Sequence, residues 1–158
     1  MPVSHEAETN RFKKVDTANP EAWDHYLRGE QLASVHDPTG LARAISYFEK
    51  AIQLDPGFAR AISSSATAHT FLGLYFDDPR RHFPEARRQA ERALALNDSL
   101  QEPQSVLGLV ALTYDWNFTE AQRRLVLASG RIRAEASLGL WLYRPFDGCR
   151  RTIKGEGG

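Results

Sequence analysis

Two carboxylates and an imidazole lie close together in one short segment, GLYFDDPRRHFPEA, and they are the side chains best suited to chemistry. Oxygen and imidazole ligands such as Asp77, Asp78 and His82 could bind a divalent metal ion. The sequence Asp78-Pro79 is also typical of a helix N-terminus, with an aspartate cap before a proline in the first turn. We therefore expect Asp78 to cap a helix and Asp77 and His82 to be solvated loop residues, and we keep a small metal-dependent enzyme as an alternative.

Other catalytic patterns are missing from the sequence. It has no P-loop, no Gly-x-Gly-x-x-Gly, no His-Glu-x-x-His and no Gly-x-Ser-x-Gly. His25, His36 and His69 occur singly, and the one cysteine, Cys149, has no histidine near it in the sequence. We predict that the protein is not an enzyme, with no catalytic residue, no metal and no cofactor.

The composition is that of a globular protein without a charge bias towards any partner. Of 158 residues, 42% are apolar and 25% are charged, and twenty basic side chains balance twenty acidic ones. This balance does not favour nucleic acid as a partner. Basic residues do outnumber acidic ones over 121–158, by eight to three. A solvated tail is the favoured interpretation there, and RNA or an acidic peptide bound by this basic tail is the weaker alternative.

The sequence gives no sign of a membrane segment. No apolar run approaches the roughly 18 residues that a membrane span needs. The first residues, MPVSHEAETNRFKK, carry charges where a signal peptide needs an apolar stretch. We expect a cytoplasmic protein without a membrane partner.

Local signals for helix starts and stops divide the chain into helices. Asn19-Pro20 and Asp37-Pro38 each place a capping side chain before a proline, and Asp55-Pro56 ends the second of these helices. Between the last two signals, apolar residues recur at helical spacing and form one face: Leu41, Ile45, Phe48 and Ile52. No stretch of clean alternation indicates a strand, so the chain is predicted to be all-α.

One of these helices recurs along the chain. ARAISYFEKAIQLDP aligns with EARRQAERALALND after a shift of 42 residues, and with EAQRRLVLA after a further 35. In the first and third copies two small residues seven apart flank a larger one, Phe48 between Ala44 and Ala51 and Leu125 between Ala121 and Ala128, whereas Ala90 holds this position in the second copy. Small residues let two helix backbones approach while the larger side chain fills the space between them.

This pattern resembles the tetratricopeptide repeat. Ala44, Phe48, Ala51 and Pro56 match A-x3-F-x2-A-x4-P, which is typical of the second helix of that repeat. The resemblance implies a short α-solenoid of about three helix pairs over 19–128, divided at about 19–57, 58–98 and 99–128. A flexible segment over 1–18 is expected before the repeats, and an irregular C-terminal tail over 129–158, consisting of a degenerate capping helix and the basic tail, after them.

Longer strings carry a narrower resemblance. AWDHYLRGEQLASVHDPTGLARAISYFEKAIQLDPGFARA, GLYFDDPRRHFPEA and YDWNFTEAQRR are similar to the repeat region of bacterial signalling proteins. In those proteins the repeats follow a winged-helix, adenylate-cyclase or protein-kinase domain, for which there is no room before Asn19. After Ala128 the repeat pattern is lost, although Ala134–Tyr143 could form a further helix. The resemblance implies a regulatory module, and the alternative is a truncated fragment without its own ligand.

The resemblance also implies where a ligand would bind. The first helices of successive repeats line a concave groove that receives a peptide or a partner helix. Counted from the repeat motif, the predicted groove-facing residues are Tyr26, Glu30, Arg60, Ser63, Thr67, Thr70, Glu102, Ser105, Leu109 and Leu112. Lysine and asparagine, which clamp a C-terminal carboxylate in chaperone-binding relatives, are missing at these positions. A chaperone C-terminus is therefore not favoured as the ligand. The predicted groove is mildly polar and shallow, so we expect a protein or peptide partner bound with micromolar affinity.

Aromatic residues gather near the predicted helix ends. They could stack on bases, but packing between neighbouring turns is the favoured interpretation, so we expect them in the core. They are Trp23, Tyr26, Phe71, Tyr75, Phe76, Tyr114, Trp116 and Phe118.

Overall fold

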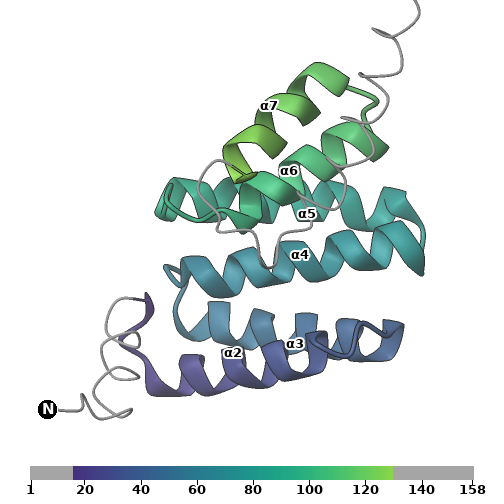
Figure 1. Ribbon diagram of the computed structural model, residues 1–158. Helices are drawn as coiled ribbons and strands as arrows, with labels where there is room; N and C mark the ends of the chain where they lie inside the picture. Colours follow the sequence, from purple (N-terminus) through teal and green to yellow (C-terminus); the bar gives the residue numbers. More distant parts are fainter. Residues whose placement is uncertain (1–15, 130–158) are drawn as a thin grey trace, which may run out of the picture.

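The computed structural model describes residues 16–129, and this part of the chain is all-α (Figure 1). Six helices follow one another in it, with short connections and no strand between them. They are α2 (Pro20–Ala33), α3 (Pro38–Leu54), α4 (Ala59–Tyr75), α5 (Pro79–Leu96), α6 (Glu102–Thr113) and α7 (Phe118–Ser129). None of these six helices is long and apolar enough to cross a membrane.

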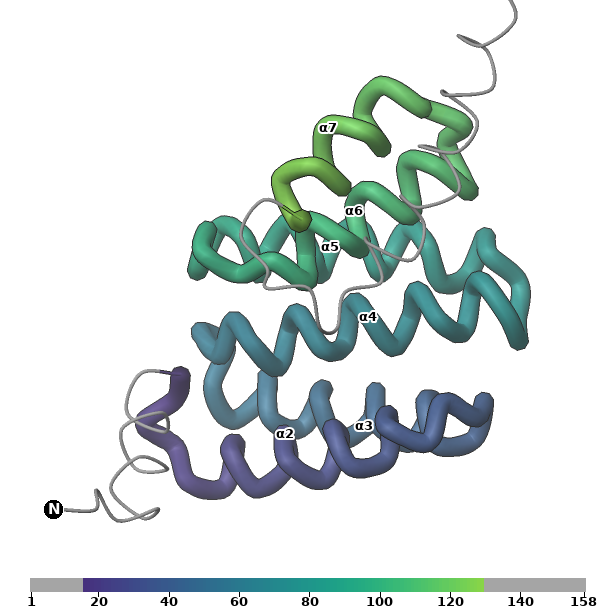
Figure 2. The backbone as a smooth tube through the Cα atoms, viewed as in Figure 1, coloured from purple at the N-terminus to yellow at the C-terminus, as the bar shows by residue number. Residues whose placement is uncertain are grey.

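The helices pack pairwise in the order of the sequence. α2 packs on α3, α4 on α5 and α6 on α7, and α4 also contacts α3 and α6, the helices on either side of it. Figure 2 follows the backbone from one pair to the next, with each pair stacked on the one before. The predicted all-α class is confirmed, and the arrangement is that of a short helical repeat array.

Side-chain caps begin three of the helices where the sequence predicts them. The Asn19 side chain accepts hydrogen bonds from the first turn of α2, and Asp37 and Asp78 do the same for α3 and α5. A proline follows each cap, where a missing N–H costs no helical hydrogen bond. At the other end of α3, Asp55 is the C-cap residue. These caps fix the helix ends from local sequence alone.

The two helices of each pair approach closely because a glycine faces a large side chain. A Cβ atom placed on Gly29 of α2 would lie 2.5 Å from Cε1 of Phe48 in α3. At Gly73 the same atom would lie 2.9 Å from Phe83, and at Gly108 it would lie 2.8 Å from Leu125. Real Cβ atoms do not approach other atoms so closely. Each first helix therefore needs a glycine where the second helix inserts its largest side chain.

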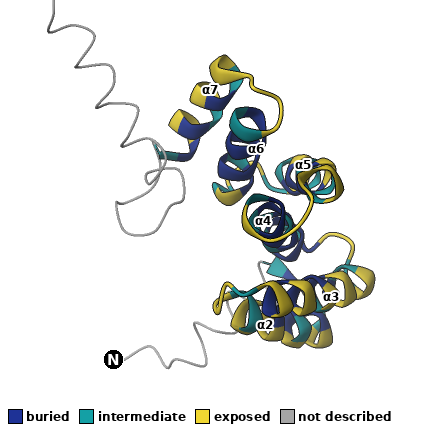
Figure 3. Cartoon of the chain, turned by 90° about the vertical axis from the view of Figure 1, so that its right-hand side faces the viewer, coloured by how far each residue is buried: buried dark blue, intermediate teal, exposed yellow. Residues whose placement is uncertain are grey.

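The buried residues form one cluster around the first pair and another between the second and third pairs. Phe48 is fully buried between Ala44 and Ala51, which are also fully buried, as the repeat pattern predicts. Phe58, just before α4, packs its ring against Tyr26 of α2, with 5.2 Å between ring centroids. The second cluster contains Phe83. Figure 3 shows the buried surfaces of the helices facing one another.

Two contacts tie the residues before α2 to the helix pairs. The Thr17 hydroxyl is buried and donates a hydrogen bond of 2.5 Å to Asp55 Oδ2, and Arg60 Nη2 lies 3.2 Å from Asp16 Oδ2. We expected a flexible segment over 1–18, and the structure describes only residues 16–18 of it. Other expectations fall outside the described residues, namely the rest of that segment, the capping helix over Ala134–Tyr143, the basic tail beyond residue 129 and Cys149.

The expectation that the aromatic residues lie in the core is correct only in part. Trp23 and Tyr26 are buried, whereas the aromatic residues around the connections after α4 and α6 are exposed. Trp116 is 72% exposed and has a positive φ of 55°, which is uncommon for a bulky residue. The exposed set is Tyr75, Phe76, Tyr114, Trp116 and Phe118. These residues lie at or beyond the ends of the first helices, where the neighbouring pair does not cover them.

Replacing Phe48 with alanine should unfold the chain at a much lower denaturant concentration. Removal of the fully buried ring leaves a cavity that the small neighbouring side chains cannot fill, and this costs roughly 3–5 kcal/mol of folding stability. Glu49, the next residue, is exposed, so Glu49→Ala should change stability by less than about 0.5 kcal/mol. Urea denaturation of both variants measures this, and equal midpoint shifts would contradict the assignment of Phe48 to the core.

Gly29→Ala should destabilise the chain, although replacing glycine with alanine at an exposed helix position normally stabilises the helix by about 1 kcal/mol. The added methyl group overlaps the Phe48 ring, and such overpacking costs typically about 1–3 kcal/mol. In a Phe48→Ala background the methyl group enters the cavity instead, so the same substitution should become neutral or stabilising. Denaturation of the two single variants and the double variant tests this, and simple additivity would argue against the close approach.

Candidate functional site

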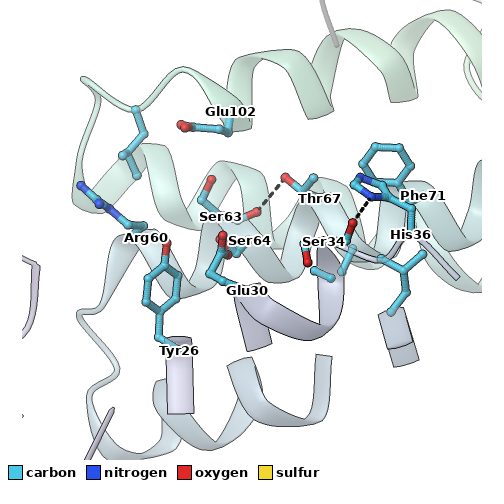
Figure 4. Close-up of a pocket in the computed structure, with 14 residues that line it drawn as sticks. Tyr26, Glu30, Ser34, His36, Arg60, Ser63, Ser64, Thr67, Phe71 and Glu102 are labelled. Carbon is cyan, nitrogen blue, oxygen red and sulfur yellow. Dashed lines mark hydrogen bonds between the residues drawn. The ribbon is translucent and has the colours of Figure 1, made fainter. Parts of the chain in front are cut away.

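A pocket of about 440 Å³ lies on the face that the first helices of the pairs share (Figure 4). It runs from α2, across α4, to the start of α6. Polar side chains form much of the wall: Tyr26, Glu30, Ser34, His36, Arg60, Ser63, Ser64, Thr67 and Glu102. Apolar side chains form the rest: Ala33, Leu41, Ala68, Phe71 and Leu100. A mixed wall of this kind can both orient a ligand and bury part of it.

Six of the ten predicted groove residues line this pocket. They are Tyr26, Glu30, Arg60, Ser63, Thr67 and Glu102. Helical spacing explains how they come together, because residues three or four apart lie on the same face of a helix. Tyr26 and Glu30 are four apart on α2, while Arg60, Ser63 and Thr67 follow one another at three and four residues on α4.

The other four predicted groove residues lie away from the pocket. Thr70, Ser105 and Leu109 are buried, and Leu112 is half-buried. The Thr70 hydroxyl donates a hydrogen bond of 2.8 Å to the Ala66 carbonyl of its own helix. A role for these four residues in ligand binding stays a prediction. The pocket is therefore concentrated on the first two pairs and includes only the beginning of the third.

Some residues that line the pocket were not predicted from the sequence. Ser64 was missed because the repeat positions skip it, and its neighbour Ser63 was chosen instead. His36 lies in the turn after α2 with a positive φ of 57°, and its ring packs edge-on against Phe71 at 5.0 Å between centroids. A histidine in a turn carries no sequence signal that it will close one end of a pocket.

Burial and neighbouring charges change the acidities of two groups in the pocket. Burial raises the pKa of Glu30, and the nearby charge of Glu102 raises it further, whereas Ser64 and Arg60 act in the opposite direction. Glu30 as a whole residue is exposed, although it lies in the pocket wall. Burial, followed by the charge of Glu30, also raises the pKa of Tyr26 to about 12. Tyr26 is therefore a neutral hydroxyl at physiological pH.

The Ser63 side chain offers a hydrogen-bonding group that the described part of the chain does not use. The residue is only 3% exposed, and its backbone carbonyl accepts a hydrogen bond of 3.2 Å from the Thr67 hydroxyl. Its own hydroxyl points into the pocket (Figure 4) and has no hydrogen-bond partner among residues 16–129. Buried hydroxyl groups are usually paired, so this group is well placed to meet a ligand.

The structure brings two of the three residues that the sequence suggested as a metal site together and gives the third another role. Asp78 caps α5 as predicted, since its carboxylate accepts a hydrogen bond of 2.9 Å from the Arg80 backbone N–H. Asp77 instead pairs with Arg81 and with His82 Nε2 at 2.9 Å. Within residues 16–129 no group of three or more His, Cys, Asp or Glu side chains is arranged to hold a metal ion.

His82 is not the solvated loop residue that we expected, because it lies in the first turns of α5 against α4. Its Nδ1 lies 3.0 Å from Nδ1 of His69, which is on α4. This contact needs one proton between the two nitrogens, because two N–H groups would otherwise face each other. Burial, and then the charge of His82, lower the pKa of His69 to about 4. The pair was missed because thirteen residues and a turn separate its members.

The stability of the chain should fall as the pH is lowered from about 6.5 to 4, because of His69. Its pKa is about 4 in the folded protein and near the ordinary value of 6.5 in the unfolded chain. Between these values the unfolded state binds the proton, which costs about 1–2 kcal/mol of folding stability by about pH 5. Urea denaturation at several pH values should show a shallower decline for His69→Asn than for the intact chain. His36→Asn, at an exposed histidine, is the control, and equal declines for all three proteins would contradict the prediction.

Comparisons with known proteins identify no family for this chain, so its description rests on the structure and the sequence pattern. No protein-family model matches the chain, and a search of the curated proteins finds no match either. What stands is that residues 16–129 form six helices packed in sequential pairs, with a mixed polar and apolar pocket across the first helices of the pairs.

Proposed function

We propose that this chain is a non-enzymatic protein-interaction module that binds a peptide or a partner helix across its first helices. One observation carries the proposal, namely that α2, α4 and the start of α6 together line the pocket. A surface shared by successive helix pairs is the usual binding surface of helical repeat arrays. No single pair could form it alone, so the function depends on how the pairs stack.

The chemistry of the wall suits a peptide. A peptide needs partners for its backbone N–H and C=O groups, and the hydroxyls of Ser63, Ser64 and Thr67 lie together on α4 to provide them. Phe71, which is half-buried on the same helix, offers an apolar surface in the same pocket. The wall is a mixture of polar and apolar side chains, and we expect an affinity in the micromolar class.

We also propose that the helix pairs are tetratricopeptide repeats, similar to the regulatory region of bacterial signalling proteins. The burial of Ala44, Phe48 and Ala51 supports this, because the repeat pattern requires all three in the core. In such a protein the module would act in the cytoplasm and relay partner binding to an effector domain. A truncated fragment without a ligand is the alternative, and it would bind no peptide at this surface.

Filling the pocket should abolish peptide binding without unfolding the chain. Peptides are selected from a random displayed library against the intact protein, and their affinities are measured by fluorescence anisotropy. Thr67→Met, at a half-buried position in the pocket wall, should weaken binding by about tenfold or more, corresponding to about 1.4 kcal/mol. Ser46→Met is the matched control, because Ser46 is exposed on α3 and outside the pocket, and it should leave binding within about twofold.

Thermal melting of both variants shows whether they remain folded. A library that yields no binding peptide, or selected peptides that bind Thr67→Met as tightly as the intact chain, would overturn the proposed function. Amide chemical shifts at Ser64 and Thr67 on peptide addition give an independent map of the bound surface.

A further inference from the structure

The pocket carries a charge imbalance that points to the chemistry of its ligand. Glu30 and Glu102 lie on opposite walls, on α2 and at the start of α6, with the serines of α4 between them (Figure 4). Resting on the proposed function, we infer that the bound segment carries a lysine or arginine whose cationic head lies between Glu30 and Glu102. Three features of the site, its unpaired carboxylates, the Ser63 hydroxyl and the apolar wall, support this.

The two carboxylates have no basic partner in the described part of the chain. Arg60 is the only lysine or arginine among the residues that line the pocket, and its guanidinium is engaged by Asp16, which lies outside the lining, at 3.2 Å. Neither Glu30 nor Glu102 forms an ion pair within residues 16–129. Three carboxylates therefore share one guanidinium, and a positive charge from the ligand would correct the imbalance.

Mutual repulsion between the carboxylates supports the same conclusion. Burial is the main cause that raises the pKa of Glu30 and the charge of Glu102 adds to it, while the Ser64 hydroxyl and the charge of Arg60 offset this only in part. A bound ammonium or guanidinium group would lower that pKa again. Binding of a basic ligand should therefore release a proton from Glu30 and weaken at low pH. Binding of an acidic ligand at the same site should not weaken in this way.

The Ser63 hydroxyl supports a basic ligand independently of the charges in the pocket. Ser63 is 3% exposed as a residue, and its hydroxyl points into the pocket and has no partner in the described range. An ammonium or guanidinium group carries several N–H donors and no acceptor, so it can donate to this oxygen as well as to a carboxylate. A ligand carboxylate would instead face two like charges in the same space.

The apolar wall fits the rest of a long basic side chain. Ala33 of α2, Phe71 of α4 and Leu100, just before α6, line the pocket and are half-buried, so they offer apolar surface there. Lysine and arginine bury a methylene stem against such surfaces while the charged head meets polar groups. A bare metal ion would leave this wall unused.

The test uses four capped peptides, Ac-Ala-Ala-Xaa-Ala-Ala-NH2, in which the central residue is lysine, arginine, glutamine or glutamate. Their binding to the intact chain is followed by amide chemical shifts of Ser63, Ser64 and Thr67. The lysine or arginine peptide should bind about tenfold more tightly than the glutamine peptide, as one charge-assisted contact predicts. The glutamate peptide should bind most weakly, and lowering the pH from about 7.5 to 5 should weaken the basic peptides.

A matched pair of double variants locates the effect. Glu30→Gln with Glu102→Gln should remove the preference for a basic residue, both in the four peptides and in the library selection. Glu49→Gln with Glu91→Gln changes the charge equally at exposed positions outside the pocket and should leave the preference intact. Retention of the preference in the Glu30 and Glu102 variant would overturn the inference.

Other outcomes separate this inference from the function on which it rests. Library peptides that bind at the pocket without enrichment in lysine or arginine would overturn the inference and leave the interaction module standing. Putrescine that binds as tightly as the lysine peptide would also overturn it, because the site would then take a free polyamine. A library that yields no binder at all overturns the proposed function itself.

Discussion

Close packing of a glycine against a large side chain is the constraint on which the rest of the structure depends. Gly29 meets Phe48, Gly73 meets Phe83, and Gly108 meets Leu125, in every case within one helix pair. A methyl group at these glycines would force the two helices apart, because the facing atoms belong to rings or branched side chains that are already buried. The short distance inside each pair in turn sets how the next pair can stack on it.

Stacking at that distance places three first helices beside one another and creates the pocket. Phe58 connects the first two pairs, since its ring contacts Trp23 and Tyr26 of α2 just before α4 begins. With α2 and α4 held in this way, Glu30 faces Ser63 and Ser64 across the pocket (Figure 4). The polar surface is thus a consequence of packing on the apolar side of the same helices.

The residues before α2 decide the charge of that surface. Asp16 engages Arg60, which leaves the carboxylates of Glu30 and Glu102 without a basic partner in the described range. Thr17 fixes this arrangement through its hydrogen bond to Asp55 at the end of α3. A short segment outside the repeats therefore converts a pocket of mixed charge into an acidic one, and no repeat pattern predicts that.

The amino-acid sequence by itself determined the all-α class, the caps at Asn19, Asp37 and Asp78, and the buried alanines around Phe48. These features depend on residues within about two turns of one another, so periodicity and capping reveal them. Only the tertiary structure decided that Ser64 and His36 line the pocket while Leu109 is buried, that His69 meets His82, and that Trp116 is exposed. Such outcomes depend on the distance and angle between separate helices, which side-chain volumes set jointly across the whole array.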